Sequence, residues 1–150
     1  MISGGYSGEA RASGAFNPRR LKEVELVGRT AGLSSTDEVV DVGFGFAQQD
    51  IYWTRRFAPR RIIGINITPE QVRLARVRVR KLGLEERIDL REGSATATGL
   101  PDACCDVVTS VECAFHFETR ERFRSIPETL YEPFDYVLAA ARRPGTEPVK

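Results

Sequence analysis

A short apolar run that ends in two closely spaced glycines constrains the fold of this chain most. The run is Val39-Val40-Asp41-Val42-Gly43-Phe44-Gly45-Phe46-Ala47, and a helical pattern follows it. Glycine adopts backbone angles that other residues avoid, and it lets a ligand lie against the main chain. The spacing therefore predicts a buried strand that turns sharply into a helix. A dinucleotide fingerprint would need a third glycine at position 48, where Gln48 stands, which disfavours a nicotinamide-dependent oxidoreductase.

The spacing Asp41-x-Gly43-x-Gly45-x-Ala47 resembles the cofactor loop of class I S-adenosylmethionine-dependent methyltransferases. The resemblance covers about residues 19 to 124 and is nearest to the branch that methylates sugars, natural products and other small molecules. It implies a Rossmann-like α/β fold, a doubly wound parallel sheet with helices on both faces. It also implies S-adenosyl-L-methionine as cofactor, with the loop amides facing its methionine portion and Asp41 holding its ammonium group. An ordinary glycine-rich turn is the alternative interpretation.

The end of the second predicted strand supplies further cofactor contacts by the same resemblance. Asn66 stands where the family often has an acid that binds the ribose hydroxyls, and Ile67 follows it. Because an amide lacks the charge of a carboxylate, we expect weaker hydrogen bonds from Asn66. Thr68 and Gln71 have the spacing of a capping box at the start of the next helix. Gln71 is also expected to lie beside the cofactor.

Two later segments complete the site that the resemblance implies. Ser94 and Ala95 occupy the turn in which the family commonly has an acid that accepts a hydrogen bond from the adenine amino group. Residues 112–117 resemble the acceptor-side loop of small-molecule O-methyltransferases. His116 is the candidate catalytic base, because imidazole titrates near neutral pH, and a packing histidine is the alternative. Glu112 is counted among the cofactor contacts, or it orients a substrate hydroxyl.

Hydrophobic periodicity and turn residues predict alternating helices and strands. Helices are expected from residue 18 to the glycine at 32, over 48–57, and from 69 to the glycine at 83. Strands are expected over 38–42, 61–66, 88–91 and 106–111, with a candidate fifth strand over 136–140. This alternation is typical of an α/β fold with a parallel sheet.

The family pattern ends early in this chain. Beyond about Arg124 the sequence no longer follows the helix, glycine-rich turn and final strands of the family, so we predict a C-terminally truncated methyltransferase domain. We divide the chain into a flexible arm (1–16), an incomplete cofactor-binding domain (17–141) and a polar tail (142–150). An incomplete sheet leaves an unpaired edge, which favours a homodimer or low stability.

Charge and cysteine content limit the partners. With 22 basic and 21 acidic residues the net charge is +1, so no global field would attract nucleic acid or an anionic membrane. We find no apolar stretch of membrane-spanning length and no signal-like start. Three cysteines without paired C-x-x-C spacing, and a single histidine, favour a cytoplasmic location and disfavour a metal site.

Two functional hypotheses follow. The first is a methyltransferase that uses S-adenosyl-L-methionine and a small-molecule acceptor, with a hydroxyl as the preferred acceptor group. The second is a truncated or degenerate relative that binds the cofactor weakly or not at all and lacks catalysis. The glycine spacing and the His116 segment favour the first hypothesis, whereas Asn66, Ser94 and the short C-terminal part favour the second.

Overall fold

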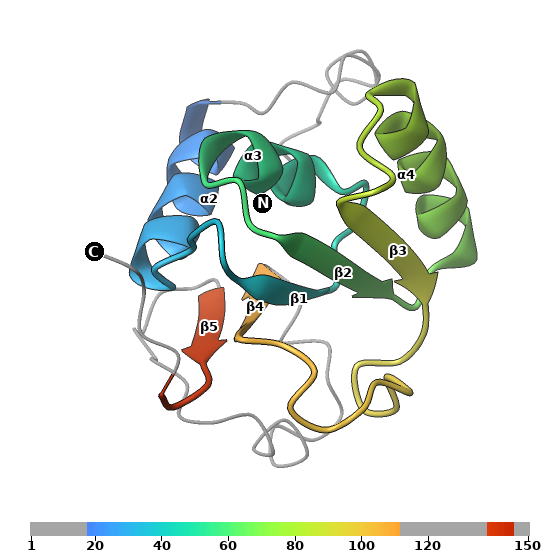
Figure 1. The fold of residues 1–150 in the computed structure, drawn as a ribbon. Coiled ribbons are helices and arrows are strands. Elements are labelled where there is room, and N and C mark those ends of the chain that lie inside the picture. The colour runs from blue at the N-terminus through green and yellow to red at the C-terminus, as the bar shows by residue number, and fades with distance from the viewer. Residues whose placement is uncertain (1–17, 112–137, 146–150) are drawn as a thin grey trace, which may run out of the picture.

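The computed structural model describes residues 18–111 and 138–145 as a single α/β layer structure (Figure 1). Its elements are α2 (Pro18–Thr30), β1 (Glu38–Val42), α3 (Gln48–Arg56), β2 (Arg61–Asn66), α4 (Pro69–Lys81), β3 (Ile88–Glu92), β4 (Val107–Val111) and β5 (Leu138–Arg142). The strands form one sheet in the order β3-β2-β1-β4-β5. This order is that of a Rossmann-like sheet, so the predicted fold class is confirmed.

The last strand runs in a direction that the sequence did not indicate. The strands β3, β2, β1 and β4 are parallel to one another, whereas β5 is antiparallel to β4. Leu138 lies opposite Val111, and Arg142 lies opposite Val107. The strand ends at Arg142, so this residue belongs to the sheet and not to the tail predicted from position 142. The arm predicted over 1–16 lies outside the described residues.

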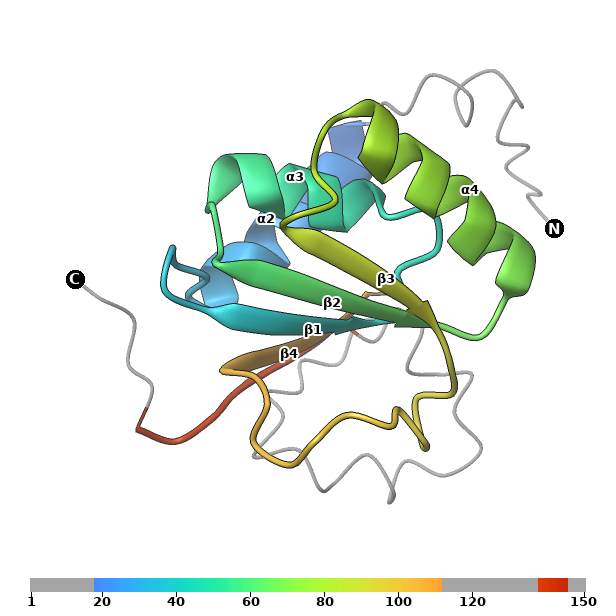
Figure 2. The ribbon, with the colours of Figure 1, turned by 45° about the vertical axis from the view of Figure 1, so that its right-hand side comes forward.

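The three described helices all cover one face of the sheet (Figure 2). Trp53 of α3 is fully buried there, and its indole Nε1 donates a hydrogen bond to the Val24 carbonyl oxygen of α2 at 2.8 Å. The apolar residues packed with Trp53 come from α2 and from the strands β1, β2 and β4: Val24, Val27, Val39, Ile62, Val107 and Val111. The helix α4 packs beside them over β3 through Val72, Ala75 and Val79.

The opposite face of the sheet is packed by the loop between β3 and β4. This second layer consists of Val40, Val42, Ile63 and Ile65, with Ala95, Leu100, Cys104, Cys105 and Val108 packed against them. Both faces of β1 and β2 are therefore buried, which is why these strands are almost continuously apolar. Helices were expected on both faces of the sheet, whereas the described helices cover one face only (Figure 2), and residues 112–137 lie outside the described residues.

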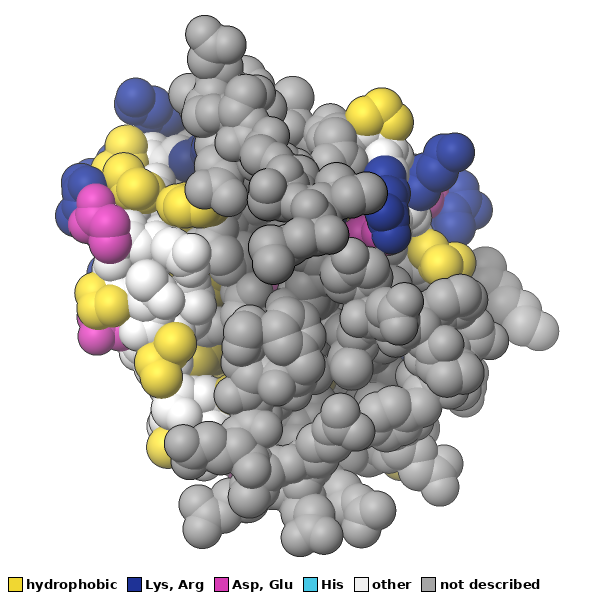
Figure 3. Space-filling model, turned by 180° about the vertical axis from the view of Figure 1, so that it is seen from behind, with side chains coloured by type: hydrophobic (Ala, Val, Ile, Leu, Met, Phe, Trp, Pro, Cys, Tyr) yellow, Lys and Arg dark blue, Asp and Glu magenta, His cyan; other side chains and the backbone are white. Residues whose placement is uncertain are grey.

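The surface of the described residues mixes charge with small hydrophobic groups (Figure 3). The helix α4 is rich in arginine. Arg73 on its outer face pairs with Glu70 at 2.6 Å, so the charge of this arginine is neutralised locally. Among the described helices, none is both long and apolar enough to cross a membrane. The strands β3 and β5 are the edges of the described sheet, and the homodimer stays a prediction.

Candidate functional site

A bend of left-handed backbone joins β1 to α3, as the glycine spacing predicted. In this glycine loop (residues 43–47), Gly43, Gly45 and Ala47 have φ angles of 78°, 59° and 59°. The Gly43 amide donates a hydrogen bond to the Ile65 carbonyl oxygen of β2 at 2.7 Å, which ties the loop to the neighbouring strand. The loop therefore lies at the carboxyl ends of two parallel strands, where open α/β sheets bind ligands.

The inner side of the glycine loop is filled, while its outer side is open. Phe44 is 1% exposed and lies over Gly64, where an added Cβ would come within 2.6 Å of the phenyl ring. A side chain at position 64 would therefore push the loop away from β2. By contrast, an added Cβ at Gly45 would have no atom of the described residues within 4 Å. A ligand can therefore approach the loop backbone from its outer side.

Asp41 lies beneath the glycine loop on the helix-covered face of β1 and has no exposed surface. Its Oδ1 accepts a hydrogen bond from Thr109 Oγ1 at 2.8 Å, and its Oδ2 accepts one from Gln49 Nε2 at 3.0 Å. Burial raises the pKa of Asp41 to about 6, against the opposing effect of these two hydrogen bonds. A ligand on the outer side of the loop would meet the charge of Asp41 across the loop backbone.

Asp50, in the first turn of α3, was not identified from the sequence. Its carboxyl group is fully buried close to the Asp41 carboxyl group, whose negative charge acts on it. Among the described residues, neither oxygen of this carboxyl group has a hydrogen-bond partner. Burial and the negative charge of Asp41 raise the pKa of Asp50 well above its usual range. Of the two acids, Asp50 is therefore the one that keeps its proton more readily.

Asn66 connects the end of β2 to the glycine loop and to α4. Its Nδ2 donates to Gln71 Oε1 at 2.8 Å and reaches the Gly45 carbonyl oxygen at 3.5 Å. The predicted capping box is wrong, because Thr68 makes no side-chain cap and Gln71 pairs with Asn66 instead. Ile67 follows with 70% of its surface exposed. Three predicted cofactor residues thus lie together beside the loop.

Ser94 and Ala95 follow β3, and they are less directly connected to the glycine loop. Ser94 Oγ is hydrogen-bonded to Thr96 Oγ1 at 3.0 Å within its own turn. Ala95 packs on the face of the sheet that the described helices do not cover. His116 and Glu112 lie outside the described residues.

A groove of about 510 Å³ lies at the other end of the sheet and is unrelated to this site. It is lined by residues that begin β2 and β3 and by the second half of α4. Two arginines of this groove bind other groups of the fold. Arg61 pairs with Asp89 at 2.8 Å, and Arg76 Nε donates to the Leu90 carbonyl oxygen at 2.9 Å. Arg76 thereby covers an acceptor of the edge strand β3.

Comparison with known proteins gives a family match and a curated relative. Residues 40–126 match the family model described as "Methyltransferase domain". Erythromycin 3''-O-methyltransferase of Saccharopolyspora erythraea is 43% identical over 93 residues, which is 62% of this chain and 30% of that protein. The chain therefore spans about a third of the length of this relative.

Solved structures share the fold. A putative sarcosine dimethylglycine methyltransferase from Galdieria sulphuraria superposes with a TM-score of 0.64 at 21% identity, over 68% of this chain and 40% of that chain. A SAM-dependent methyltransferase from Thiobacillus denitrificans in complex with S-adenosyl-L-homocysteine has a TM-score of 0.55 at 22% identity, over 67% and 38% of the two chains. At these identities the likeness concerns the fold alone.

Proposed function

Since the chain belongs to the S-adenosylmethionine-dependent methyltransferases, whose domain model matches more than half of it, we propose that it holds the cofactor for methyl transfer to a small-molecule hydroxyl. The observation that carries this proposal is the glycine loop. Three left-handed residues bend it over a buried acid, and its outer side is open at Gly45. The O-methyltransferase activity in the name of the 43% identical relative supports a hydroxyl acceptor.

The residues around the glycine loop fit an adenosyl sulfonium ligand. The negative charge of Asp41 beneath the loop complements an ammonium group, and the 70% exposed side chain of Ile67 offers an apolar surface to an adenine ring. The Asn66 amide, held by Gln71, would bind a ribose hydroxyl. When bound, S-adenosylmethionine supplies the activated methyl group. The residues of this chain would position that methyl group.

Three further roles rest on the family resemblance. Ser94 and Ala95 would line the adenine side of the site, and Glu112 would lie beside the cofactor. His116 would take the proton from the acceptor hydroxyl, which makes the oxygen a better nucleophile. Holding the acceptor and the methyl donor in line would lower the barrier further, because oriented reactants avoid about 7–11 kcal/mol of entropy and solvent cost.

The cofactor role of the glycine loop is tested by replacing Gly45 with leucine. The new side chain would enter the space outside the loop, so we expect the affinity for S-adenosyl-L-methionine in calorimetry to fall by at least about 100-fold. Gly83→Leu is the matched control, because Gly83 also has a positive φ (66°) and no atom within 4 Å of an added Cβ. Equal affinities of the two variants would contradict a ligand at the loop.

The catalytic role of His116 is tested by label transfer from S-adenosyl-L-methionine to a panel of hydroxylated small molecules. Replacing His116 with alanine should lower kcat by about 10²–10⁴-fold, since general base catalysis contributes that much. Cofactor affinity should stay unchanged in the same variant. Methyl transfer at the wild-type rate would remove His116 from the mechanism, and binding without any transfer by the wild-type chain would favour the truncated, inactive relative.

A further inference from the structure

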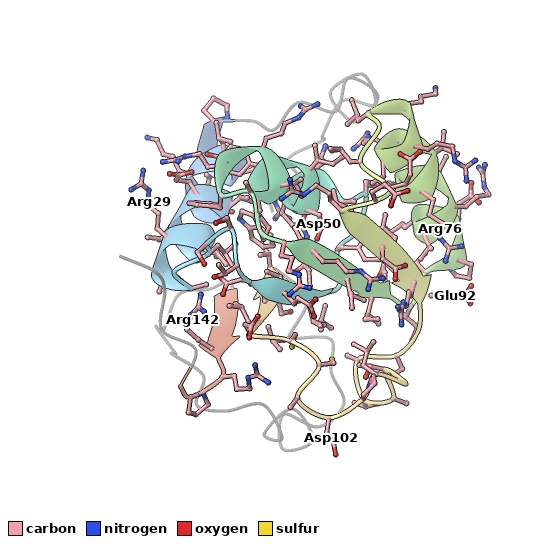
Figure 4. The ribbon with its side chains drawn as sticks, in the orientation of Figure 1. Arg29, Asp50, Arg76, Glu92, Asp102 and Arg142 are labelled. Carbon is pink, nitrogen blue, oxygen red and sulfur yellow. The ribbon has the colours of Figure 1, made fainter. Side chains whose placement is uncertain are left out.

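Two buried carboxyl groups are the feature of this fold that the proposed function leaves unexplained. Asp41 on β1 and Asp50 on α3 are both 0% exposed, and they lie close enough together that each affects the pKa of the other. Figure 4 shows Asp50 in the interior, between α3 and the sheet. Two carboxylates in contact cannot both be ionised at low cost, so a pair of this kind holds a proton.

The surroundings determine which carboxyl group carries the proton. Thr109 on β4 and Gln49 on α3 each donate to one oxygen of Asp41, so the ionised form of Asp41 is solvated by the protein. Asp50 has no comparable donors, because neither of its carboxyl oxygens has a hydrogen-bond partner among the described residues. From α2, the charge of Arg20 further favours ionised Asp41. Thr109, Gln49 and Arg20 are thus the groups that lower the pKa of Asp41, and none of them acts on Asp50.

We propose that Asp41 and Asp50 form a proton-sharing carboxyl pair, and that a cation bound outside the glycine loop releases the shared proton from Asp50 to solvent. Before binding, the pair carries one negative charge. After binding, the positive charge of the ligand stabilises a second negative charge on the pair. The proton-release half of this inference rests on the proposed function, because the ammonium group of S-adenosyl-L-methionine is the cation.

Proton release has a measurable consequence for affinity. If one proton leaves upon binding, affinity rises with pH by up to about tenfold per pH unit. Asp50→Asn keeps a side-chain donor for Asp41 but has no proton to release, so we expect its affinity to change far less with pH. A merely structural role of Asp50 would alter affinity by the same factor at every pH.

The experiment is calorimetry of S-adenosyl-L-methionine binding at pH 6 to 7.5, in phosphate and in Tris buffers. The dependence of the heat on buffer gives the protons released, and we expect up to about one for the wild-type chain and none for Asp50→Asn. Asp102→Asn is the matched control, because this acid is exposed in the loop between β3 and β4 and far from α3 (Figure 4). It should behave as the wild type.

The outcomes separate the two proposals. Binding by the wild-type chain without buffer dependence, or with the same buffer dependence in Asp50→Asn, would overturn proton release. A wild-type chain that binds no cofactor would contradict the proposed function, and proton release with it. Carboxyl ¹³C NMR of the free protein then decides proton sharing alone. In the wild-type chain we expect two aspartate carboxyl signals that titrate together above about pH 5, and in Asp50→Asn only one such signal. Titration of both wild-type signals below that pH would overturn proton sharing between Asp41 and Asp50.

Discussion

Replacing Arg142 with alanine should lower the free energy of unfolding by about 3–5 kcal/mol, measured by urea denaturation. The guanidinium group contacts both carboxylate oxygens of Asp37, at 2.8 and 2.9 Å. It also donates to the carbonyl oxygens of Ala31 (3.1 Å) and Gly32 (2.7 Å), just after α2. Figure 4 shows Arg142 between β5 and α2. Alanine would leave a buried carboxylate and two carbonyl groups without this donor.

The pKa of Asp37 shows how strongly the two residues depend on each other. Burial would raise this pKa, yet the hydrogen bonds from Arg142 and Ser34 hold it below its usual range. Arg143→Ala is the matched control, since its ion pair with Asp106 at 2.9 Å is 42% exposed on the arginine side and should contribute less than about 1 kcal/mol. Arg142→Lys should restore only part of the loss, because an ammonium group lacks the planar fork. Equal losses at positions 142 and 143 would contradict this account.

The chain should lose stability as the pH rises from mildly acidic to alkaline. The folded state holds the proton of Asp41 up to about pH 6, whereas an unfolded aspartate releases it near 3.8. A raised pKa stabilises the fold below the unfolded value, and this stability is lost as the pH rises through the folded value. For Asp41 the whole loss between pH 3.8 and pH 6 is on the order of 3 kcal/mol, of which about 1.4 kcal/mol falls above pH 5. Asp50, whose pKa is raised further, extends the loss to higher pH.

Urea unfolding at about pH 5 and pH 8 tests this pH dependence. The lowered pKa values of Asp37 and Asp89 act in the opposite direction, but only below about pH 4, and so do not mask the effect. Asp50→Asn removes one of the two buried protons, so the difference between the two pH values should shrink. A wild-type chain that is more stable at pH 8 than at pH 5 would show that the pair is not held protonated.

The elements with strong local signals could be predicted from the sequence. Glycine spacing predicted the bend after β1, and helical periodicity predicted α4 almost to the residue. The direction of β5 could not be predicted, because the contact at the end of this strand is distant in the sequence: Arg142 binds Asp37, which lies 105 positions away. No local pattern marks such a contact, and an arginine near a proline and a glycine reads as part of a polar tail.

The candidate site was predicted in outline but not in its hydrogen bonding. The roles implied for Gly45, Asn66 and Gln71 agree with their closeness in the structure, although Gln71 pairs with Asn66 and not with the helix cap. Asp50 was missed because an acid in the first turn of a helix is ordinarily explained by its favourable interaction with the helix dipole. A usable signal was present: Asp41 precedes the loop, and Asp50 stands in the first turn after it, so both can face the same interior layer.

The reversed direction of β5 has a practical consequence. Arg142 pairs with the first residue of β4, so the chain reaches Gly145 at the amino ends of the parallel strands, across the sheet from the glycine loop. A fluorescent probe attached at Gly145 would therefore report detachment of the edge strand while remaining remote from any molecule seated at the loop. Folding and ligand capture could then be followed independently in one labelled sample.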